Sequence, residues 1–206
     1  LDSCAHSIYY KIPLLRKLSV SRIKSILRLF GVRVGPITKE DLHVKTVFGI
    51  MHPFIASFVP GYNEEAWIRD VYSKALNRGV NELEKVVWYI YEYRKTRLFK
   101  TLLSRKEWKL FMVWFDLADW MGHLYMGKSN LKIFKTYLEL SRLAARIKRN
   151  LSKDTLFMVV SDHGMNPRGE HSPRAFYSFS ESLNWRPKKI TDYYAFIKSL
   201  LLTGDL

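Results

Sequence analysis

One continuous apolar run decides the fold of this chain: Leu110-Phe111-Met112-Val113-Trp114-Phe115, which stops at Asp116. Such a run is typical of a strand that is covered on both faces. A second run, residues 156–160, has the same character and stops at Ser161-Asp162-His163-Gly164. Between them, residues 129–150 carry apolar side chains at three- and four-residue spacing, which predicts a helix. Strand, helix and strand form a crossover unit, so we expect the two strands to be parallel in one sheet.

The segments around this unit indicate the same fold class. The sequence predicts further strands at 44–50, 55–59 and 175–179, and further helices at 81–108 and 191–202. The aromatic side chains of the helix at 81–108 are expected to pack in the core: Trp88, Tyr89, Tyr91, Tyr93 and Phe99. We therefore predict an α/β fold with a mostly parallel sheet and helices on both faces.

The composition limits the possible classes of protein and of metal site. The 206 residues suit one domain or a piece of a larger one, and 48% hydrophobic residues exclude a disordered chain. Cys4 is the single cysteine, so the chain has neither an internal disulfide nor a cysteine-based zinc site. Any metal must therefore be held by histidine and carboxylate side chains.

The charge of the chain favours anionic partners. Lysine and arginine number 34 against 19 acidic residues, which leaves a net charge of +15. Every charged side chain from Lys11 to Arg33 is positive, and apolar residues recur there at helical spacing. This segment is either a basic amphipathic helix that binds a membrane surface or nucleic acid, or a helix packed on the protein with its charges in water.

Acidic and histidine residues follow both of the strongest predicted strands. Asp119 and His123 lie four residues apart, close enough to meet one metal if this segment is helical. Asp162 and His163 end the second strand, and His171 follows eight residues after His163. The carboxyl ends of parallel strands meet at one edge of a sheet, so we expect these side chains to gather there. Carboxylates and imidazoles without thiolates suit zinc, manganese or iron, whereas each pair alone also fits an ordinary hydrogen-bonded surface pair or a helix cap.

These motifs resemble the metal-binding part of the type I phosphodiesterase and nucleotide pyrophosphatase family, which belongs to the alkaline phosphatase superfamily. The resemblance rests on Asp119-Trp120-Met121-Gly122-His123, on Ser161-Asp162-His163-Gly164-Met165 and on the later His171. It implies an alkaline phosphatase-like fold and a hydrolase of phosphoester bonds that uses two zinc ions and acts on an anionic small-molecule ester. Asp119, His123 and His171 would hold one ion, and Asp162 and His163 would hold the other.

Two parts of the family pattern have no match in this sequence. The family completes its second metal with an Asp at the end of an early strand, and its nucleophile is a Thr or Ser at a helix start. Thr46 and Ser57 lie inside apolar segments, so neither is assigned as the nucleophile. Because the sequence opens with Leu1 rather than Met, we expect an amino-terminal portion to be missing. The predicted organisation is a basic helical segment at 1–40 and a partial metal-binding hydrolase domain at 41–206.

Other polar residues near the motifs have two interpretations each. Arg168 and Arg174 either hold a substrate phosphate or are solvated at the surface. Asp116 either orders the loop or the His123 ring, or is a solvated carboxylate. The same alternatives hold for Glu170 beside His171.

The remaining histidines and the ends of the chain add little to the functional prediction. No companion acid lies at ligand spacing from the other three histidines, which are expected to be structural or exposed: His6, His43 and His52. The sequence shows no signal-peptide pattern and no apolar run of roughly 18 residues, and we expect a cytoplasmic location. The alternatives to the hydrolase are a basic module that binds nucleic acid or an anionic membrane surface, and a relative without catalytic activity.

Overall fold

The computed structural model describes residues 38–104 and 107–203. The chain divides into two compact units, residues 1–44 with 60–63, and residues 45–59 with 64–206. The described part of the first unit contains the short 3-10 helix η2 (Lys39–Asp41) and a contact of 5.2 Å between the Lys39 ammonium and the Tyr62 ring. The basic segment from Lys11 to Arg33 lies outside the described residues, and the boundary between residues 40 and 41 stays a prediction.

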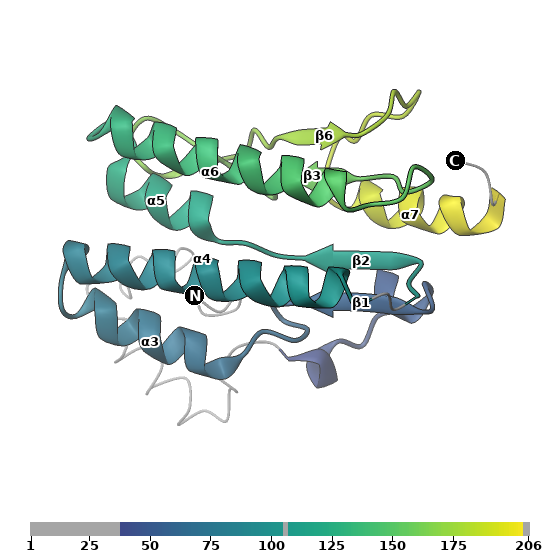
Figure 1. The fold of residues 1–206 in the computed structure, drawn as a ribbon, viewed down its shortest axis with the longest axis horizontal. Coiled ribbons are helices and arrows are strands. Elements are labelled where there is room, and N and C mark those ends of the chain that lie inside the picture. Colours follow the sequence, from purple (N-terminus) through teal and green to yellow (C-terminus); the bar gives the residue numbers. More distant parts are fainter. Residues whose placement is uncertain (1–37, 105–106, 204–206) are drawn as a thin grey trace, which may run out of the picture. The chain divides into compact units, whose positions relative to one another are not determined.

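The second unit contains both α-helices and short β-strands (Figure 1). Its α-helices are α3 (Ala66–Leu76), α4 (Val80–Leu102), α5 (Leu117–Tyr125), α6 (Asn130–Arg149) and α7 (Asp192–Thr203). Its strands are β1 (Phe54–Ser57), β2 (Leu110–Val113), β3 (Met158–Val160), β4 (Gly164–Met165), β5 (His171–Ser172) and β6 (Tyr177–Phe179). None of the described helices is both long enough and apolar enough to cross a bilayer.

The strands form three pairs rather than one sheet. β1 and β2 are parallel, with Phe54 opposite Leu110. β3 pairs with β6 in the antiparallel sense, and β4 pairs with β5 in the same sense. The α/β class is therefore confirmed, whereas a mostly parallel sheet is not seen among the described residues. An apolar run indicates that a strand is buried, but it does not specify which neighbour the strand pairs with.

Two element boundaries differ from the sequence prediction. Residues 44–50 do not form a strand: the 3-10 helix η3 (Val47–Gly49) occupies this segment and buries Phe48. The helix that was expected to reach Trp108 ends at Leu102, where the Ser104 hydroxyl donates to the Thr101 carbonyl. Trp108 instead packs edge-to-face on Phe111 of β2, with the ring centres 5.5 Å apart.

The hydrophobic core is built around α4, with contributions from α3, α5 and α6. Val87, Ile90 and Tyr91 of α4 are fully buried. Of the aromatic side chains predicted to pack there, Tyr91 and Phe99 are buried, and Trp88 and Tyr93 lie against the core. The prediction is wrong for Tyr89, which is exposed because it lies on the outer side of the helix.

Ion pairs between half-buried side chains join α6 to α4. The Lys95 ammonium and the Tyr91 hydroxyl both donate to Glu139 Oε1 at 2.9 Å. Burial alone would raise the pKa of Glu139, but these two hydrogen bonds outweigh burial and lower the pKa below its usual value. α6 is therefore held in place from one side, and α5, which follows β2 directly, packs between it and α4.

Candidate metal centre

Helix α5 brings Asp119 and His123 onto one face. The helix begins directly after Asp116, and residues four positions apart in a helix lie one above the other. His123 Nε2 is 3.3 Å from Asp119 Oδ1. The helical conformation on which the sequence argument depended is thus present, and it places a carboxylate and an imidazole within reach of a common ligand.

The β4–β5 hairpin carries His171 to the same place, and His163 lies immediately before β4. The turn of the hairpin is held by Asn166, whose Oδ1 accepts hydrogen bonds from the backbone N–H groups of Arg168 and Glu170 at 2.8 and 3.1 Å. Because Asn166 organises the turn through its own side chain, the direction of the returning strand is set locally.

Two glycines allow α5 and the hairpin to approach closely. A Cβ atom on Gly122 would lie 2.7 Å from the terminal methyl of Met165. A Cβ atom on Gly169 would lie 3.2 and 3.3 Å from the carbonyl oxygens of Gly122 and His123, and Gly169 has a positive φ of 76°. At Gly122 a larger residue would require the flexible Met165 side chain to move. At Gly169 it would press on backbone carbonyl oxygens and strain a positive φ, which would push the hairpin that carries His171 away from α5.

Three ligand atoms form a small triangle. His123 Nε2 is 3.0 Å from His171 Nε2, which is 3.1 Å from Asp119 Oδ1. The third side, from Asp119 Oδ1 to His123 Nε2, is 3.3 Å. In a tetrahedral zinc site with bonds of about 2.1 Å, neighbouring ligand atoms lie roughly 3.4 Å apart. The spacing therefore suits three ligands on one small, four-coordinate cation.

The hydrogen bonds of two rings point their Nε2 atoms toward this triangle. His123 Nδ1 lies 2.7 Å from the Gly169 carbonyl oxygen, and His163 Nδ1 lies 3.1 Å from the Gly164 carbonyl oxygen. A carbonyl only accepts, so each Nδ1 must donate its proton, which leaves Nε2 as the basic nitrogen in the neutral ring. Metal-bound histidines usually have such a partner on the second nitrogen. The facing Nε2 atoms of His123 and His171 need a proton or a cation between them.

Asp162 and His163 border the triangle. The His163 ring stacks on the His171 ring at 3.8 Å, and His163 Nε2 is 3.8 Å from Asp119 Oδ1 and 3.7 Å from Asp162 Oδ1. A second choice of three ligand atoms, from Asp119, His163 and His171, spans up to 4.8 Å. We favour the set with His123 because its three distances are shorter and more equal. The structure thus brings all five predicted residues together.

Four further polar residues were considered near the centre, and the structure bears on the roles of two of them, Glu170 and Asp116. Arg168 and Arg174 are exposed, and their role toward substrate stays a prediction. Glu170 accepts a hydrogen bond from the Asn166 amide at 2.9 Å, so it supports the turn instead of contacting His171. Asp116 is buried and contacts Arg94 and Tyr72, so it is neither a solvated carboxylate nor a partner of the His123 ring, and its role in ordering the loop stays a prediction.

Asp116 belongs to a buried cluster that the sequence did not indicate. The Arg94 guanidinium, fully buried, donates to Asp116 Oδ1 at 2.6 Å, and the Tyr72 hydroxyl donates to Oδ2 at 2.9 Å. Burial raises the pKa of Asp116, and the Arg94 charge and the Tyr72 hydrogen bond act in the opposite direction. Burial and the Asp116 charge also raise the pKa of Tyr72.

Comparison with known proteins agrees with the motifs. The family model for type I phosphodiesterase / nucleotide pyrophosphatase matches residues 37–176, a range that contains the whole candidate centre. The chain is 28% identical over 89 residues to GPI ethanolamine phosphate transferase 2 of Kluyveromyces lactis. That match covers 43% of this chain and spans 11% of the length of the relative. No solved structure matches the chain significantly.

Proposed function

Because the chain belongs to the type I phosphodiesterase/nucleotide pyrophosphatase family of the alkaline phosphatase superfamily, we propose that it is the metal-binding part of a zinc-dependent enzyme acting on phosphoesters. Asp119, His123 and His171 are the proposed ligands of one ion. The observation that carries this proposal is their triangle of ligand atoms, with sides of 3.0, 3.1 and 3.3 Å.

The residues of the chain prepare this site before any ion binds. The Gly169 carbonyl fixes the His123 ring with Nε2 toward the triangle, and the Gly164 carbonyl does the same for His163. Three protein ligands leave one position of a four-coordinate zinc for an oxygen ligand. A zinc ion bound there would polarise a phosphoryl oxygen and lower the pKa of an oxygen nucleophile.

Asp162 and His163 are proposed as ligands of a second ion. Two ligands are too few for tight binding, so the intact protein must supply others. We place the missing Asp and the Thr or Ser nucleophile in parts of a longer parent, which would cleave its ester by in-line attack through a covalent phospho-Thr or phospho-Ser. The relative in Kluyveromyces lactis is named as an ethanolamine phosphate transferase, so an acceptor other than water is equally compatible with this chemistry.

Metal analysis of the purified chain tests the first part of the proposal. We expect one equivalent of zinc after mild purification, and a tetrahedral absorption spectrum when cobalt replaces zinc. Asp119→Asn and His123→Ala should abolish stoichiometric uptake, whereas His43→Ala, at an exposed histidine outside the centre, should not change it. Substoichiometric zinc in a folded wild-type chain would favour a non-catalytic relative.

Activity and polyanion binding separate the remaining alternatives. We expect weak or no hydrolysis of a chromogenic phosphodiester, and robust zinc-dependent hydrolysis would contradict the view that the nucleophile lies elsewhere.

Arg168 and Arg174 are proposed to contact the phosphate of the substrate, and Arg→Gln substitutions at each position would test this role. Asp119→Ala and His163→Ala should abolish metal uptake if the chain is part of an enzyme. If the chain is only a basic binding module, these substitutions should leave its salt-sensitive binding of nucleic acid unchanged.

A further inference from the structure

The outer face of α6 carries large apolar side chains that the core does not use. Leu131 and Phe134 are exposed over 63% and 62% of their surface, and Leu138 is also exposed. Positions separated by three, four and seven residues lie on one face of a helix. These three residues therefore form a continuous apolar strip at the amino-terminal half of α6.

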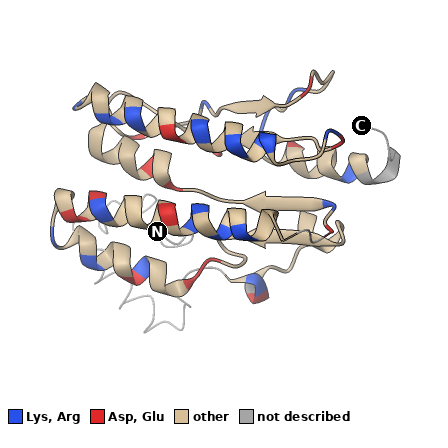
Figure 2. Cartoon of the chain, viewed as in Figure 1, with Lys and Arg blue, Asp and Glu red and all other residues tan. Residues whose placement is uncertain are grey.

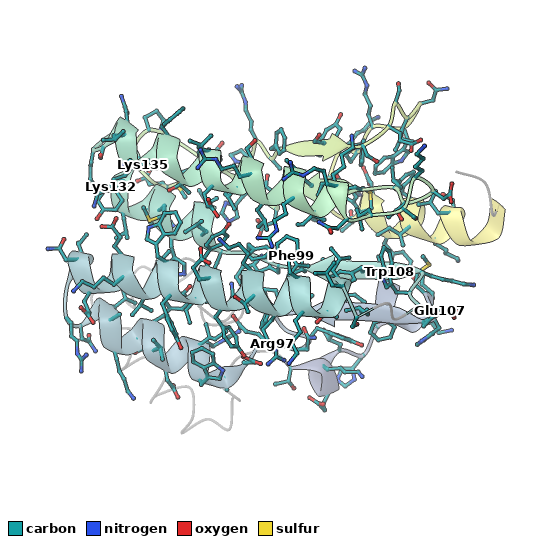
Figure 3. All side chains as sticks on the ribbon, viewed as in Figure 1. Arg97, Phe99, Glu107, Trp108, Lys132 and Lys135 are labelled. Carbon is teal, nitrogen blue, oxygen red and sulfur yellow. The ribbon has the colours of Figure 1, made fainter. Side chains whose placement is uncertain are left out.

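Basic side chains extend the same strip. Lys135, Arg142 and Arg149 are exposed, and their positions in the helix place them along the line of Leu131 and Leu138. We call these six residues the outer stripe: Leu131, Phe134, Lys135, Leu138, Arg142 and Arg149. Lys135 is labelled in Figure 3, and Figure 2 shows lysine and arginine recurring along α6 with a single acidic turn.

The acidic residue of α6 does not belong to the outer stripe. Glu139 is the single acid of the helix, and it accepts hydrogen bonds from Lys95 and Tyr91 of α4. The side of α6 toward α4 is also held by Leu143, which is buried, and by Arg146, whose guanidinium lies 4.2 Å from the Phe99 ring. Phe99 reaches toward α6 from α4 (Figure 3). The position of α6 is therefore secured without the outer stripe.

We propose that the outer stripe is a docking surface for an anionic lipid membrane. Phenylalanine and leucine beside lysine and arginine, with no carboxylate, are the composition of a helix that lies in the headgroup region. Nucleic acid would use the basic residues but not the exposed Leu131 and Phe134. Pairing with a second copy would bring positive side chains together on a chain whose net charge is already +15.

Vesicle binding tests the proposal directly, in the presence of a chelator so that the result does not depend on the metal centre. The full chain should float with vesicles of phosphatidylcholine containing about one third phosphatidylserine, and Leu131→Ser with Phe134→Ser should weaken binding at least about tenfold. The matched control is Leu76→Ser with Val80→Ser, which removes two apolar side chains of similar exposure, 53% and 51%, from other helices. This control should change binding less than about twofold, since these residues lie outside the outer stripe.

A local probe distinguishes docking through α6 from docking through other basic segments. The chain has one cysteine, so Cys4→Ser with Phe134→Cys gives a single site for an environment-sensitive dye. We expect increased, blue-shifted fluorescence with anionic vesicles and little change with pure phosphatidylcholine. Arg142→Gln with Arg149→Gln should reduce the affinity several-fold and lower its salt dependence.

Three results would overturn the proposal. The first is vesicle binding that leaves the dye signal unchanged, or that the Leu131 and Phe134 substitutions do not weaken. The second is a dimer in sedimentation experiments that the same substitutions dissociate, which would make the stripe a subunit interface. The third is selective loss of duplex DNA binding in these variants while vesicle binding persists.

Discussion

Helix α5 joins two charged clusters that differ in how their members are satisfied. Asp116, at the start of the helix, is buried against Arg94 at 2.6 Å and Tyr72 at 2.9 Å. Asp119, one turn later, is partly exposed and lies between His171 and His123 at 3.1 and 3.3 Å. The buried cluster combines opposite charges and complementary donors, whereas the exposed cluster combines one carboxylate with nitrogen lone pairs.

This difference separates a structural role from a binding role. In the buried cluster, both carboxylate oxygens of Asp116 accept a hydrogen bond, one from Arg94 and one from Tyr72, and the Arg94 charge balances the charge of the carboxylate. In the exposed cluster, the ligand atoms have the same electron-donating character, so they satisfy one another only through a proton or a cation. Close approach of such groups is typical of sites that bind a metal ion.

The largest expected effect is on the buried cluster. Arg94→Met should lower the free energy of unfolding by about 3–5 kcal/mol, because it leaves the buried Asp116 carboxylate without its partner. Urea denaturation measures the change. Arg97→Met, at an exposed arginine one turn along the same helix, should change the free energy by less than about 0.5 kcal/mol. A loss below about 1 kcal/mol for Arg94→Met would show that this ion pair does not stabilise the fold.

The opposite result is expected for the exposed cluster. Asp119→Asn should weaken zinc binding at least about 100-fold and leave the free energy of unfolding of the metal-free chain within about 0.5 kcal/mol. Calorimetric titration and urea denaturation give the two quantities. Asp154→Asn, at an exposed carboxylate outside the centre, is the control for both. If Asp119→Asn destabilised the metal-free chain as strongly as Arg94→Met, the distinction between the two clusters would be wrong.

A glycine substitution connects stability to metal binding. Gly169→Ala should cost about 1–2 kcal/mol, since its φ is positive and its Cβ would press on the carbonyl oxygens of α5. It should also weaken zinc binding roughly tenfold, because the hairpin that carries His171 moves away from His123. Gly49→Ala, where a Cβ would meet nothing within 4 Å, should leave zinc affinity unchanged. Equal zinc affinity in both variants would contradict the role of close approach at Gly169.

The same two clusters show what the sequence could predict. The four-residue spacing of Asp119 and His123 predicted that both lie on one face of a helix. The position of Asp162 and His163 after a strand predicted that they lie at the edge of the sheet, together with the other candidate ligands. The contact between Arg94 and Asp116 spans 22 residues and follows no periodicity, so no pattern indicated it. The strand pairing also depends on which edges are available in space. For that reason both β3 and β6 were predicted as strands, but β3 was expected to be parallel to β2 in one sheet and not antiparallel to β6.

Glu139 is intermediate in burial between the carboxylates of the two clusters. It is half buried and accepts one hydrogen bond from Lys95 and one from Tyr91. Its pKa in the folded chain is lower than the usual 4.5, so the folded state favours the ionised form. The resulting stabilisation is fully present above that unfolded value and is lost as the pH falls through the lower folded pKa.

Glu139→Gln should therefore remove less than about 1 kcal/mol at pH 7 and reduce the acid-side slope of stability against pH. Urea denaturation between pH 3 and pH 7 measures this slope, with Glu82→Gln, in an exposed pair with Lys85, as the control. An unchanged slope in Glu139→Gln would place this ion pair with the surface pairs that contribute nothing measurable, and the attachment of α6 to α4 would then rest on its apolar contacts.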